Sequence, residues 1–579
     1  MTPSAGRRDT DWWKSAVVYQ IYPRSFADSG GDGFGDLGGI IERLDHLQAL
    51  GVDVVWLSPI YRSPQADNGY DVSDYRDIDP MFGTLDDFDT LLAKVHELGM
   101  KLVMDLVVNH TSDEHPWFVE SRSSREGPKR DWYIWRDAAG GAEPNNWGSF
   151  FGGSAWEFEP TTGQYYLHLF DRKQPDLNWE NPQVRTAVHD IMRWWLDRGV
   201  DGFRMDVINF IAKADGLPDT PAVPGQRFVI AFDGFAHGPR VHDYLAEMTR
   251  EVFAGRDGEF LTVGEMPAVT PEEARRYTDP ARGELNMVFQ FEHVSVDHSP
   301  TNKFDYLGLD RLVLKNALYR WQEALAETGW NSLYWGNHDQ PRVVSRFGDD
   351  DPQYWAASAK ALATVLHGMR GTPYVYQGEE LAMTNYPFRI PQDHQDLEAV
   401  SYYQHVLELG GDAAAALAGL ARISRDNART PMQWDAGPHA GFTAGDPWLP
   451  VNPNYAWLNA AAQIGAPDSV FAHYQALIRL RHELPVLVDG DFTALMAQDT
   501  QIWAYTRTTP HRKLLVIANC GRNPRSVRIG PEWASADLLL ANLPQTPATS
   551  GPPRLQLAGW DARIYSAATL VNTDHLIER

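Results

Sequence analysis

The chain has 579 residues, which is too long for one simple core, so two or three domains are expected. Its formal net charge is −26, from 51 basic and 77 acidic side chains, which leaves no cationic footprint for nucleic acid or for an anionic membrane. The 12% aromatic content, with 21 Trp, suits stacking against sugar rings, although most of these rings are expected to pack in the core.

The cysteine content and the first ten residues both favour a cytoplasmic protein. The lone Cys520 ends the apolar run 514–520 and cannot form an internal disulfide, so a buried thiol is expected. Residues 1–10 contain two arginines without a following apolar segment, and no stretch reaches the ~20 apolar residues of a membrane span. These features predict a cytoplasmic protein without a membrane anchor, either a monomer or a homodimer.

Short apolar runs alternate with amphipathic stretches from residue 16 to residue 376. Repeated strand–helix units predict an α/β protein with a closed parallel (β/α)8 TIM barrel. The strands are expected at 16–21, 52–57, 102–106, 202–205, 260–263, 286–289, 332–335 and 373–376. The main helices are expected at 37–50, 85–98, 184–196, 309–326 and 356–366.

Two gaps between these elements are too long for plain crossovers. Residues 111–181 follow the third strand and are expected to form a small inserted domain beside the barrel mouth, while residues 381–453 form a second insertion after the eighth strand. The barrel itself is then assigned to 1–110 and 182–488. From residue 489 to 579 the pattern changes to short alternating strands, which predict a C-terminal antiparallel β-sandwich.

Three acidic residues stand at the ends of strand-like runs: Asp206, Glu265 and Asp339. Barrel enzymes carry their reacting groups at the C-terminal ends of strands, so the three carboxylates are expected to face one mouth. Arg204 lies two residues before Asp206, on the same strand face, and is expected to keep Asp206 ionised. Glu265, crowded by the other carboxylates, is expected to have a raised pKa and to remain protonated.

A carboxylate beside a protonated acid is the pair of groups that retaining glycosidases use to cleave a glycosidic bond. One group forms a covalent glycosyl intermediate, while the other protonates the leaving oxygen and then activates water; the pair should lie ~5 Å apart. The alternative is that the three acids are helix N-caps or structural ion pairs, which would give them no common cavity.

Six segments carry a family resemblance: 105–110, 174–178, 202–210, 264–267, 337–339 and 424–434. In these segments the chain resembles the alpha-amylase family of retaining α-glucosidases (glycoside hydrolase family 13), in particular its oligo-1,6-glucosidase and dextran glucosidase branch. The resemblance implies an exo-acting hydrolase that removes glucosyl units from the non-reducing ends of small α-gluco-oligosaccharides. It implies no organic cofactor.

The resemblance also implies roles for individual residues. Asp206 is the nucleophile, Glu265 the general acid/base and Asp339 the group that fixes substrate hydroxyls. Residues matched to sugar binding are His110 and His338, which hydrogen-bond the sugar in subsite −1, the platform Tyr70, the pocket-closing pair Asp67 and Arg425, and Phe151 and Arg204. Arg429 is a rival for the role of Arg425, because spacing alone does not separate the two.

Linkage preference and a cation site are implied in the same way. Val207 follows the nucleophile where α-1,4-specific relatives have Thr, and together with Lys303 as a +1 residue it implies a preference for α-1,6 linkages. Acids and glycines alternate in the loop 28–36, a layout that can wrap oxygens around a structural Ca²⁺ or Mg²⁺. The predicted ligands are Asp28, Asp32, Asp36 and the carbonyl of Phe34; Gly30 stands where relatives usually have Asn.

Two alternatives stay open on the sequence. A transglucosylase or sucrose isomerase of the same family would pass the glucosyl group to a sugar instead of water, although residues 289–305 lack the alternating charged run typical of isomerases. A non-enzymatic family relative is the remote alternative, because such proteins have lost the acids that this chain retains.

Overall fold

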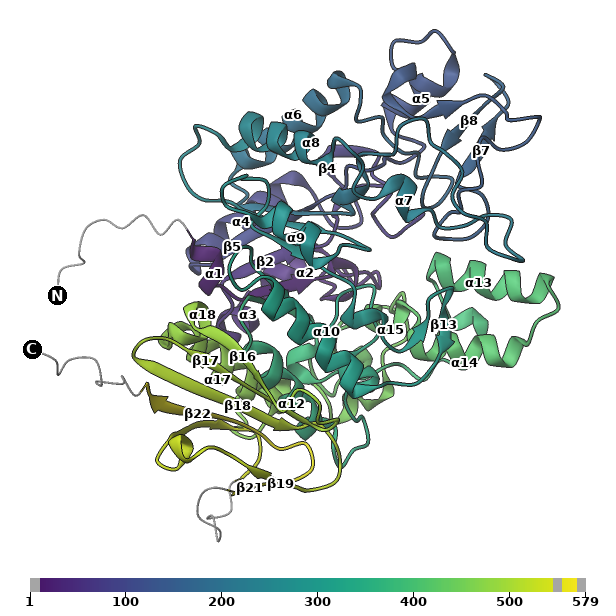
Figure 1. Cartoon of the computed structure of the whole chain (residues 1–579). Helices are drawn as coiled ribbons and strands as arrows, with labels where there is room; N and C mark the ends of the chain where they lie inside the picture. The colour runs from purple at the N-terminus through teal and green to yellow at the C-terminus, as the bar shows by residue number, and fades with distance from the viewer. Residues whose placement is uncertain (1–10, 545–553, 570–579) are drawn as a thin grey trace, which may run out of the picture.

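The computed structural model describes residues 11–544 and 554–569 (Figure 1). A parallel sheet runs in the order β11-β10-β9-β5-β2-β1-β15-β14, and a parallel bridge between Val288 and Asn331 joins its two edges. The predicted TIM barrel is therefore confirmed. Its strands are β1 Val18–Ile21, β2 Val54–Leu57, β5 Lys101–Leu106, β9 Gly202–Met205, β10 Leu261–Glu265, β11 Met287–Phe289, β14 Ser332–Leu333 and β15 Thr372–Tyr376.

Helices follow the strands and cover the outside of the barrel. They include α2 Leu37–Glu42, α3 Leu44–Leu50, α4 Leu85–Glu97, α6 Pro182–Arg198, α8 Val241–Met248, α9 Pro271–Thr278, α10 Arg311–Ala324, α12 Trp355–His367 and α17 Val470–Glu483. None of the helices in the described ranges has both the length and the apolar character that a membrane crossing requires.

Local sequence explains why these helices begin and end where they do. Thr84 caps α4 and forms a capping box with Asp87, which satisfies the free amides of the first turn. In α6, Asn181 is the N-cap, Pro182 occupies the first helical position, and Gly199 ends the helix in the left-handed conformation with φ 111°.

One predicted helix is divided in the structure. We expected a single helix over 37–50, but α2 ends at Glu42 and α3 begins at Leu44, with Arg43 at φ −110° and ψ 9° between them. Two glycines follow Leu37 at the start of α2, and glycine is a weak helix former. The break lets both short helices bury Leu and Ile side chains against the barrel.

The interior of the barrel is filled with side chains below the site. Trp56 stacks on Phe289 with ring centroids 5.7 Å apart, and Phe289 lies edge-on to Tyr374 at 4.6 Å. Aromatic pairs of this geometry add stability beyond the area they bury. Because these rings occupy the centre of the barrel, a ligand can enter only at the mouth.

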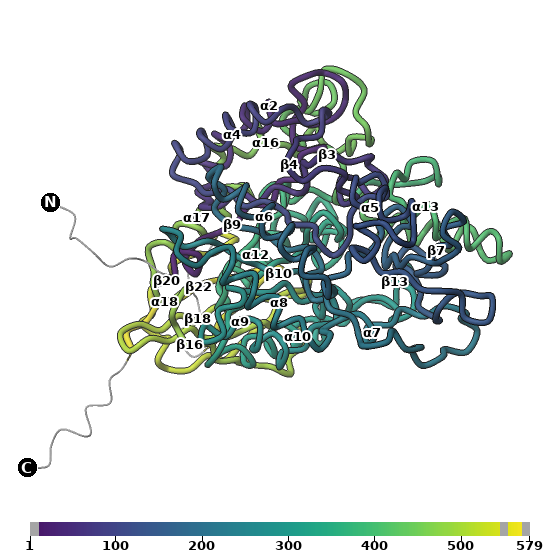
Figure 2. The backbone as a smooth tube through the Cα atoms, turned by 90° about the horizontal axis from the view of Figure 1, so that it is seen from above, coloured from purple at the N-terminus to yellow at the C-terminus, as the bar shows by residue number. Residues whose placement is uncertain are grey.

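Two insertions flank that mouth. The segment 111–181 holds α5 Pro116–Ser123 and a small sheet of β6 Trp135–Arg136, β7 Trp156–Glu159 and β8 Gln164–Leu167. The segment after β15 holds α13 Leu397–Glu408, α14 Ala413–Ile423 and α15 Asp426–Arg429. Figures 1 and 2 both place α5, β7 and α13 on one side of the barrel, away from the C-terminal strands.

The C-terminal strands form a five-stranded antiparallel sheet in the order β16-β17-β18-β22-β20 and a separate pair, β19-β21. They are β16 Asp491–Leu495, β17 Ile502–Thr508, β18 Arg512–Asn519, β19 Arg525–Arg528, β20 Asp537–Ala541, β21 Arg554–Leu557 and β22 Ala562–Ala568. The sheet is tied to the barrel helices, since the Tyr505 hydroxyl donates to the Val365 carbonyl. Of the predicted domains, residues 1–10, 545–553 and 570–579 lie outside the described residues.

Candidate active site

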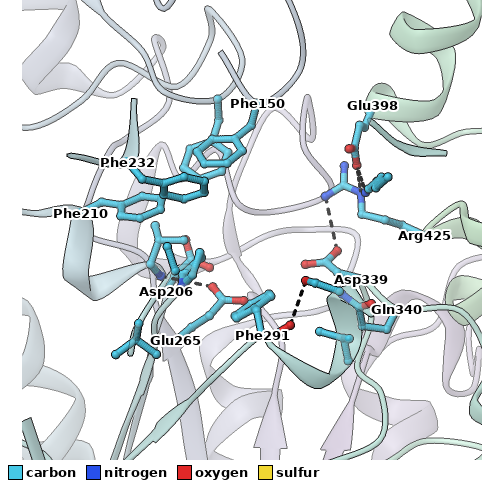
Figure 3. Close-up of a pocket in the computed structure, with 18 of the residues that line it drawn as sticks. Phe150, Asp206, Phe210, Phe232, Glu265, Phe291, Asp339, Gln340, Glu398 and Arg425 are labelled. Atoms are coloured by element: carbon cyan, nitrogen blue, oxygen red, sulfur yellow. Dashed lines mark hydrogen bonds and ion pairs between the residues drawn. The ribbon is translucent and has the colours of Figure 1, made fainter. Parts of the chain in front are cut away.

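Asp206, Glu265 and Asp339 line one cavity of about 560 Å³ at the C-terminal ends of the barrel strands (Figure 3). Asp206 directly follows β9, Glu265 is the last residue of β10, and Asp339 lies in the loop after β14. The same cavity is lined by the predicted substrate-binding residues Asp67, Tyr70, His110, Phe151, Val207, Lys303 and Arg425. The other two, Arg204 and His338, are each 1% exposed and contact the carboxylates described below.

Arg204 connects the acids beneath the cavity. Its Nη1 lies 2.7 Å from an oxygen of Asp206 and 2.7 Å from one of Asp105, and its Nη2 lies 2.7 Å from Glu265. One guanidinium thus fixes the nucleophile and acid candidates relative to each other, with charge-assisted bonds that hold their orientation.

Burial, more than Arg204, sets the protonation of this pair. Desolvation raises the pKa of Glu265 to about 8 and that of Asp206 to about 7, and Arg204 opposes both shifts. Arg204 lowers the pKa of Asp206 as expected, but loss of water outweighs the guanidinium, so the pKa is raised overall. Glu265 has the raised pKa that we expected, mainly from burial and then from Asp206 and Asp339. The first proton therefore binds to Glu265.

Asp339 has the opposite electrostatic environment. Arg429 Nη2 lies 2.7 Å and Arg425 Nη1 3.4 Å from its Oδ1. Burial alone would raise the pKa of Asp339, but the charges of Arg425 and Arg429 oppose it, and the pKa is lowered. Asp339 is thus an anion that accepts hydrogen bonds, which distinguishes it from Glu265.

The two predicted histidines are neutral hydrogen-bonding groups. Burial lowers the pKa of His110 to about 4 and that of His338 to about 3. The His338 ring stacks on Tyr70 with centroids 5.2 Å apart and an interplanar angle of 3°, so it supports the tyrosine from behind. The Tyr70 hydroxyl in turn donates to Asp105 at 3.0 Å.

Arg425 is the arginine that contacts Asp67, at 3.3 Å. Arg429 does not line the cavity; its ion pairs go to Asp339 at 2.7 Å and Asp396 at 3.9 Å. The geometry therefore favours Arg425 as the partner of Asp67 at the closed end of the cavity, while Arg429 supports Asp339 from below.

Val207 has a strained backbone. It takes the left-handed conformation with φ 34° and ψ 42°, which is an outlier for a β-branched residue. Its amide nitrogen lies 3.3 Å from Glu265 Oε2, and its side chain faces the cavity. Strained residues of this kind persist where the surrounding structure fixes them, often at functional sites.

Several residues of the site were missed by the sequence interpretation. Asp105 was seen only as part of a segment, although a carboxylate inside an apolar strand is itself a signal. Glu398 forms an ion pair with Lys303 at the cavity rim, and nothing local to α13 indicates it. Phe150, Phe210 and Phe232, labelled in Figure 3, form an aromatic wall of the cavity together with Phe170, which stacks on Phe150. Phe150 and Phe170 come from the small domain, and the other two follow β9.

The predicted cation loop lies apart from the cavity. The carboxylate of Asp28 accepts the amides of Gly31 and Gly33, and that of Asp36 accepts those of Ser29, Gly30 and Gly39. A Cβ built on Gly30 would lie 3.6 Å from an oxygen of each, so both carboxylates border one small space. Within the described residues no group of three acidic, His or Cys side chains is arranged to hold a metal ion. Asp32 is therefore not grouped with the other two acids.

Comparison with known proteins gives consistent results. The family model for the alpha amylase catalytic domain matches residues 20–490. Oligo-1,6-glucosidase of Halalkalibacterium halodurans is 56% identical over 510 residues, 88% of this chain and 90% of that protein. The Parageobacillus thermoglucosidasius enzyme of that name is 53% identical over 557 residues, 96% and 98% of the two chains.

Solved structures agree with the sequence comparison. A trehalose-6-phosphate hydrolase of Bacillus licheniformis superposes with a TM-score of 0.91 at 46% identity, over 96% of this chain and 100% of that chain. A trehalulose synthase mutant bound to Tris gives a TM-score of 0.92 at 45% identity, over the same shares. With its fold and its matched catalytic domain, this chain belongs to the alpha-amylase family of glycoside hydrolases.

Proposed function

We propose that the protein is a retaining, exo-acting α-glucosidase that hydrolyses non-reducing terminal α-glucosidic bonds of short oligosaccharides and prefers α-1,6 linkages. The observation that carries this proposal is the pair Asp206 and Glu265, held by one arginine in a single cavity and differing in proton affinity. A nucleophile and an acid placed together in this way support double displacement through a covalent glucosyl–enzyme intermediate.

The two steps follow from the pair. Asp206 attacks the anomeric carbon while Glu265 gives its proton to the leaving oxygen; Glu265, now a carboxylate, then takes a proton from the water that releases glucose. The Val207 amide and Arg204 both donate toward Glu265, and these donors stabilise the carboxylate that forms. Tyr70 supplies a flat ring for the sugar, with His338 stacked on it, and Asp339 and His110 line the cavity where they can bind the sugar hydroxyls.

Exo action rests on the closed end of the cavity. Asp67 and Arg425 lie across it, and Gln174 donates to Asp67 at 3.1 Å from behind. A longer glucan chain would have to displace this buried ion pair, which costs more than a short chain end gains. We therefore propose that the cavity binds the non-reducing terminal glucose unit of a short oligosaccharide.

The linkage preference is tested at Val207. We expect Val207→Thr to lower the ratio of kcat/KM for isomaltose to that for maltose about tenfold, because a hydroxyl facing the aglycone site favours the α-1,4-linked sugar. The measurement is initial rates on isomaltose, maltose, sucrose and trehalose. Val313→Thr on the exposed face of α10 is the matched control. Equal losses on all four sugars would contradict the role of Val207 in linkage choice.

The same panel separates the alternatives. An isomerase or transglucosylase would give isomeric or longer sugars from concentrated sucrose and maltose instead of glucose. A phosphorylated substrate, which the name of one structural relative includes, is less favoured here. The rim cations Lys303, Arg320 and Arg346 are each paired with an acid, Glu398, Glu292 and Asp297 respectively.

We also propose a weak structural cation site, for Ca²⁺ or Mg²⁺, in the loop 28–36. Oxygens of Asp28 and Asp36 converge beside Gly30, and Asp32 Oδ1 accepts the Phe34 amide. Millimolar Ca²⁺ is expected to raise the Tm by about 1–2 °C, and Asp36→Asn, which can still cap α2, is expected to abolish the shift. Asp45→Asn, at an exposed position of α3, is the control. A wild-type Tm that is equal in Ca²⁺, Mg²⁺ and EDTA would contradict the site.

The compartment and the oligomeric state of the enzyme are proposed as follows. We propose the cytoplasm as the compartment, which the free, buried thiol of Cys520 supports. We propose a monomer or homodimer whose partner is its small sugar substrate, and sedimentation velocity would measure that state.

A further inference from the structure

Asp396, a buried carboxylate outside the barrel strands, faces the closed end of the cavity from behind. It is 0% exposed and immediately precedes α13 in the insertion after β15. Its Oδ1 lies 2.5 Å from Nη2 and 2.9 Å from Nε of Arg425. These are the shortest contacts that Arg425 makes with an acid in the described part of the chain.

The contacts between Arg425 and the neighbouring acids differ in length. Its contacts with the two cavity acids are longer, 3.3 Å to Asp67 and 3.4 Å to Asp339. Figure 3 shows its guanidinium between Asp339 and Glu398. Because Asp396 takes the closest two donors, Asp67 and Asp339 retain acceptor capacity for other donors.

Asp396 remains ionised despite its burial. Desolvation would raise its pKa, but Arg425 and then Arg429 lower the pKa to about 2. The same burial raises the pKa of Asp67 to about 7, although Arg425 opposes the shift. Arg425 thus lowers the pKa of both carboxyl groups, but it outweighs burial only at Asp396, which accepts its two shortest contacts.

Asp396 is itself held in place by the backbone. Asp426 accepts the amides of Gln395 and Asp396 at 2.8 and 3.0 Å, and Asp396 Oδ1 accepts the Glu398 amide at 3.3 Å as the N-cap of α13. Its Oδ2 has no hydrogen-bond partner within the described ranges. A buried, charged cap with an unused oxygen is expensive for a purely structural role, in which a neutral cap would serve equally well.

We infer that Asp396 is a positioning residue for the proposed glucosidase site: it holds the Arg425 guanidinium back, so that Asp67 and Asp339 stay available to the hydroxyls of the terminal glucose. The inference rests on the proposed function. Without the Asp396 charge, Arg425 shifts toward Asp67 and Asp339 and competes with the sugar for the same oxygens.

The test is Asp396→Asn, which keeps a capping oxygen and removes the charge. The matched control is Asp412→Asn, the exposed N-cap of α14 in the same insertion. Glucose, the product that would occupy subsite −1, is the probe. We expect the Kd for glucose, measured by calorimetry, to rise about tenfold or more in Asp396→Asn, the loss typical of a charged hydrogen bond, and to be unchanged in Asp412→Asn.

Kinetic constants add a second readout. The KM for isomaltose and for maltose is expected to rise together in Asp396→Asn, leaving their ratio unchanged, because only the terminal-glucose site is altered. A glucose Kd equal to that of the wild type in the folded variant would overturn the inference. If Asp396→Asn does not fold, Asp396→Ser, also a good cap, takes its place. Wild-type hydrolysis of isomaltose tests the proposed function separately, since its absence would refute the activity without involving Asp396.

Discussion

Asp206→Asn is expected to lower kcat for p-nitrophenyl α-glucoside by about 10⁴-fold or more, because an amide cannot form the glucosyl ester. The fold should survive, since an amide oxygen can still accept the hydrogen bond from Arg204 Nη1. Steady-state release of p-nitrophenolate measures the loss. Asp233→Asn, at an exposed position of α7 (Phe232–Phe235) beside the cavity, is the control for removal of a nearby carboxylate.

Azide makes this test specific for a nucleophile. With Asp206→Gly, azide is expected to enter the space of the side chain and to yield β-glucosyl azide, with inverted configuration. NMR of the product gives its anomeric configuration. Residual activity within tenfold of the wild type in Asp206→Asn would exclude Asp206 as the nucleophile and would indicate a differently organised active site.

Glu265→Gln is expected to have the second-largest effect and to depend on the leaving group. General acid catalysis contributes about 10²–10⁴-fold, so isomaltose hydrolysis should fall by that factor. Nitrophenolate needs little protonation, so the first step with the aryl glucoside should stay fast while release of glucose slows. A pre-steady-state burst of nitrophenolate is the measurement. Glu272→Gln, at an exposed position of α9, is the control.

The dependence of kcat/KM on pH tests the roles of Asp206 and Glu265. With the pKa of Asp206 raised to about 7, the wild-type kcat/KM should fall as pH decreases through that value, because the nucleophile becomes protonated. With the pKa of Glu265 raised to about 8, it should also fall as pH increases, because the acid is lost. The two limbs are macroscopic properties of the pair. In Glu265→Gln the alkaline limb should disappear; a limb that persists would contradict the role of Glu265.

Much of this site could be predicted from short stretches of sequence. A strand and the carboxylate at its end are encoded within a few residues, so Asp206 and Glu265 were found together with β9 and β10. The barrel then brings strand ends to one mouth whatever the loops are. The same reasoning failed for the 37–50 helix, because its break at Arg43 depends on how α2 and α3 pack on the barrel.

The electrostatics of the site was harder to predict from the sequence. Whether Arg204 or desolvation controls Asp206 depends on how completely water is excluded, and that is a property of all the surrounding layers. The choice between Arg425 and Arg429 is similar, since both lie on one short segment and only their distances to Asp67 and Asp339 separate them. Asp396 gave no local signal at all.

The sequence by itself determined the barrel, the order of its insertions and the three acids, because strand periodicity and strand-end residues are local patterns. Only the tertiary structure decided the strength of each acid, the partner of each arginine and the part played by Asp396. The physical reason is that burial and ion-pair distance depend on segments brought together from far along the chain: Asp67 and Arg425, 3.3 Å apart, are separated by 358 positions.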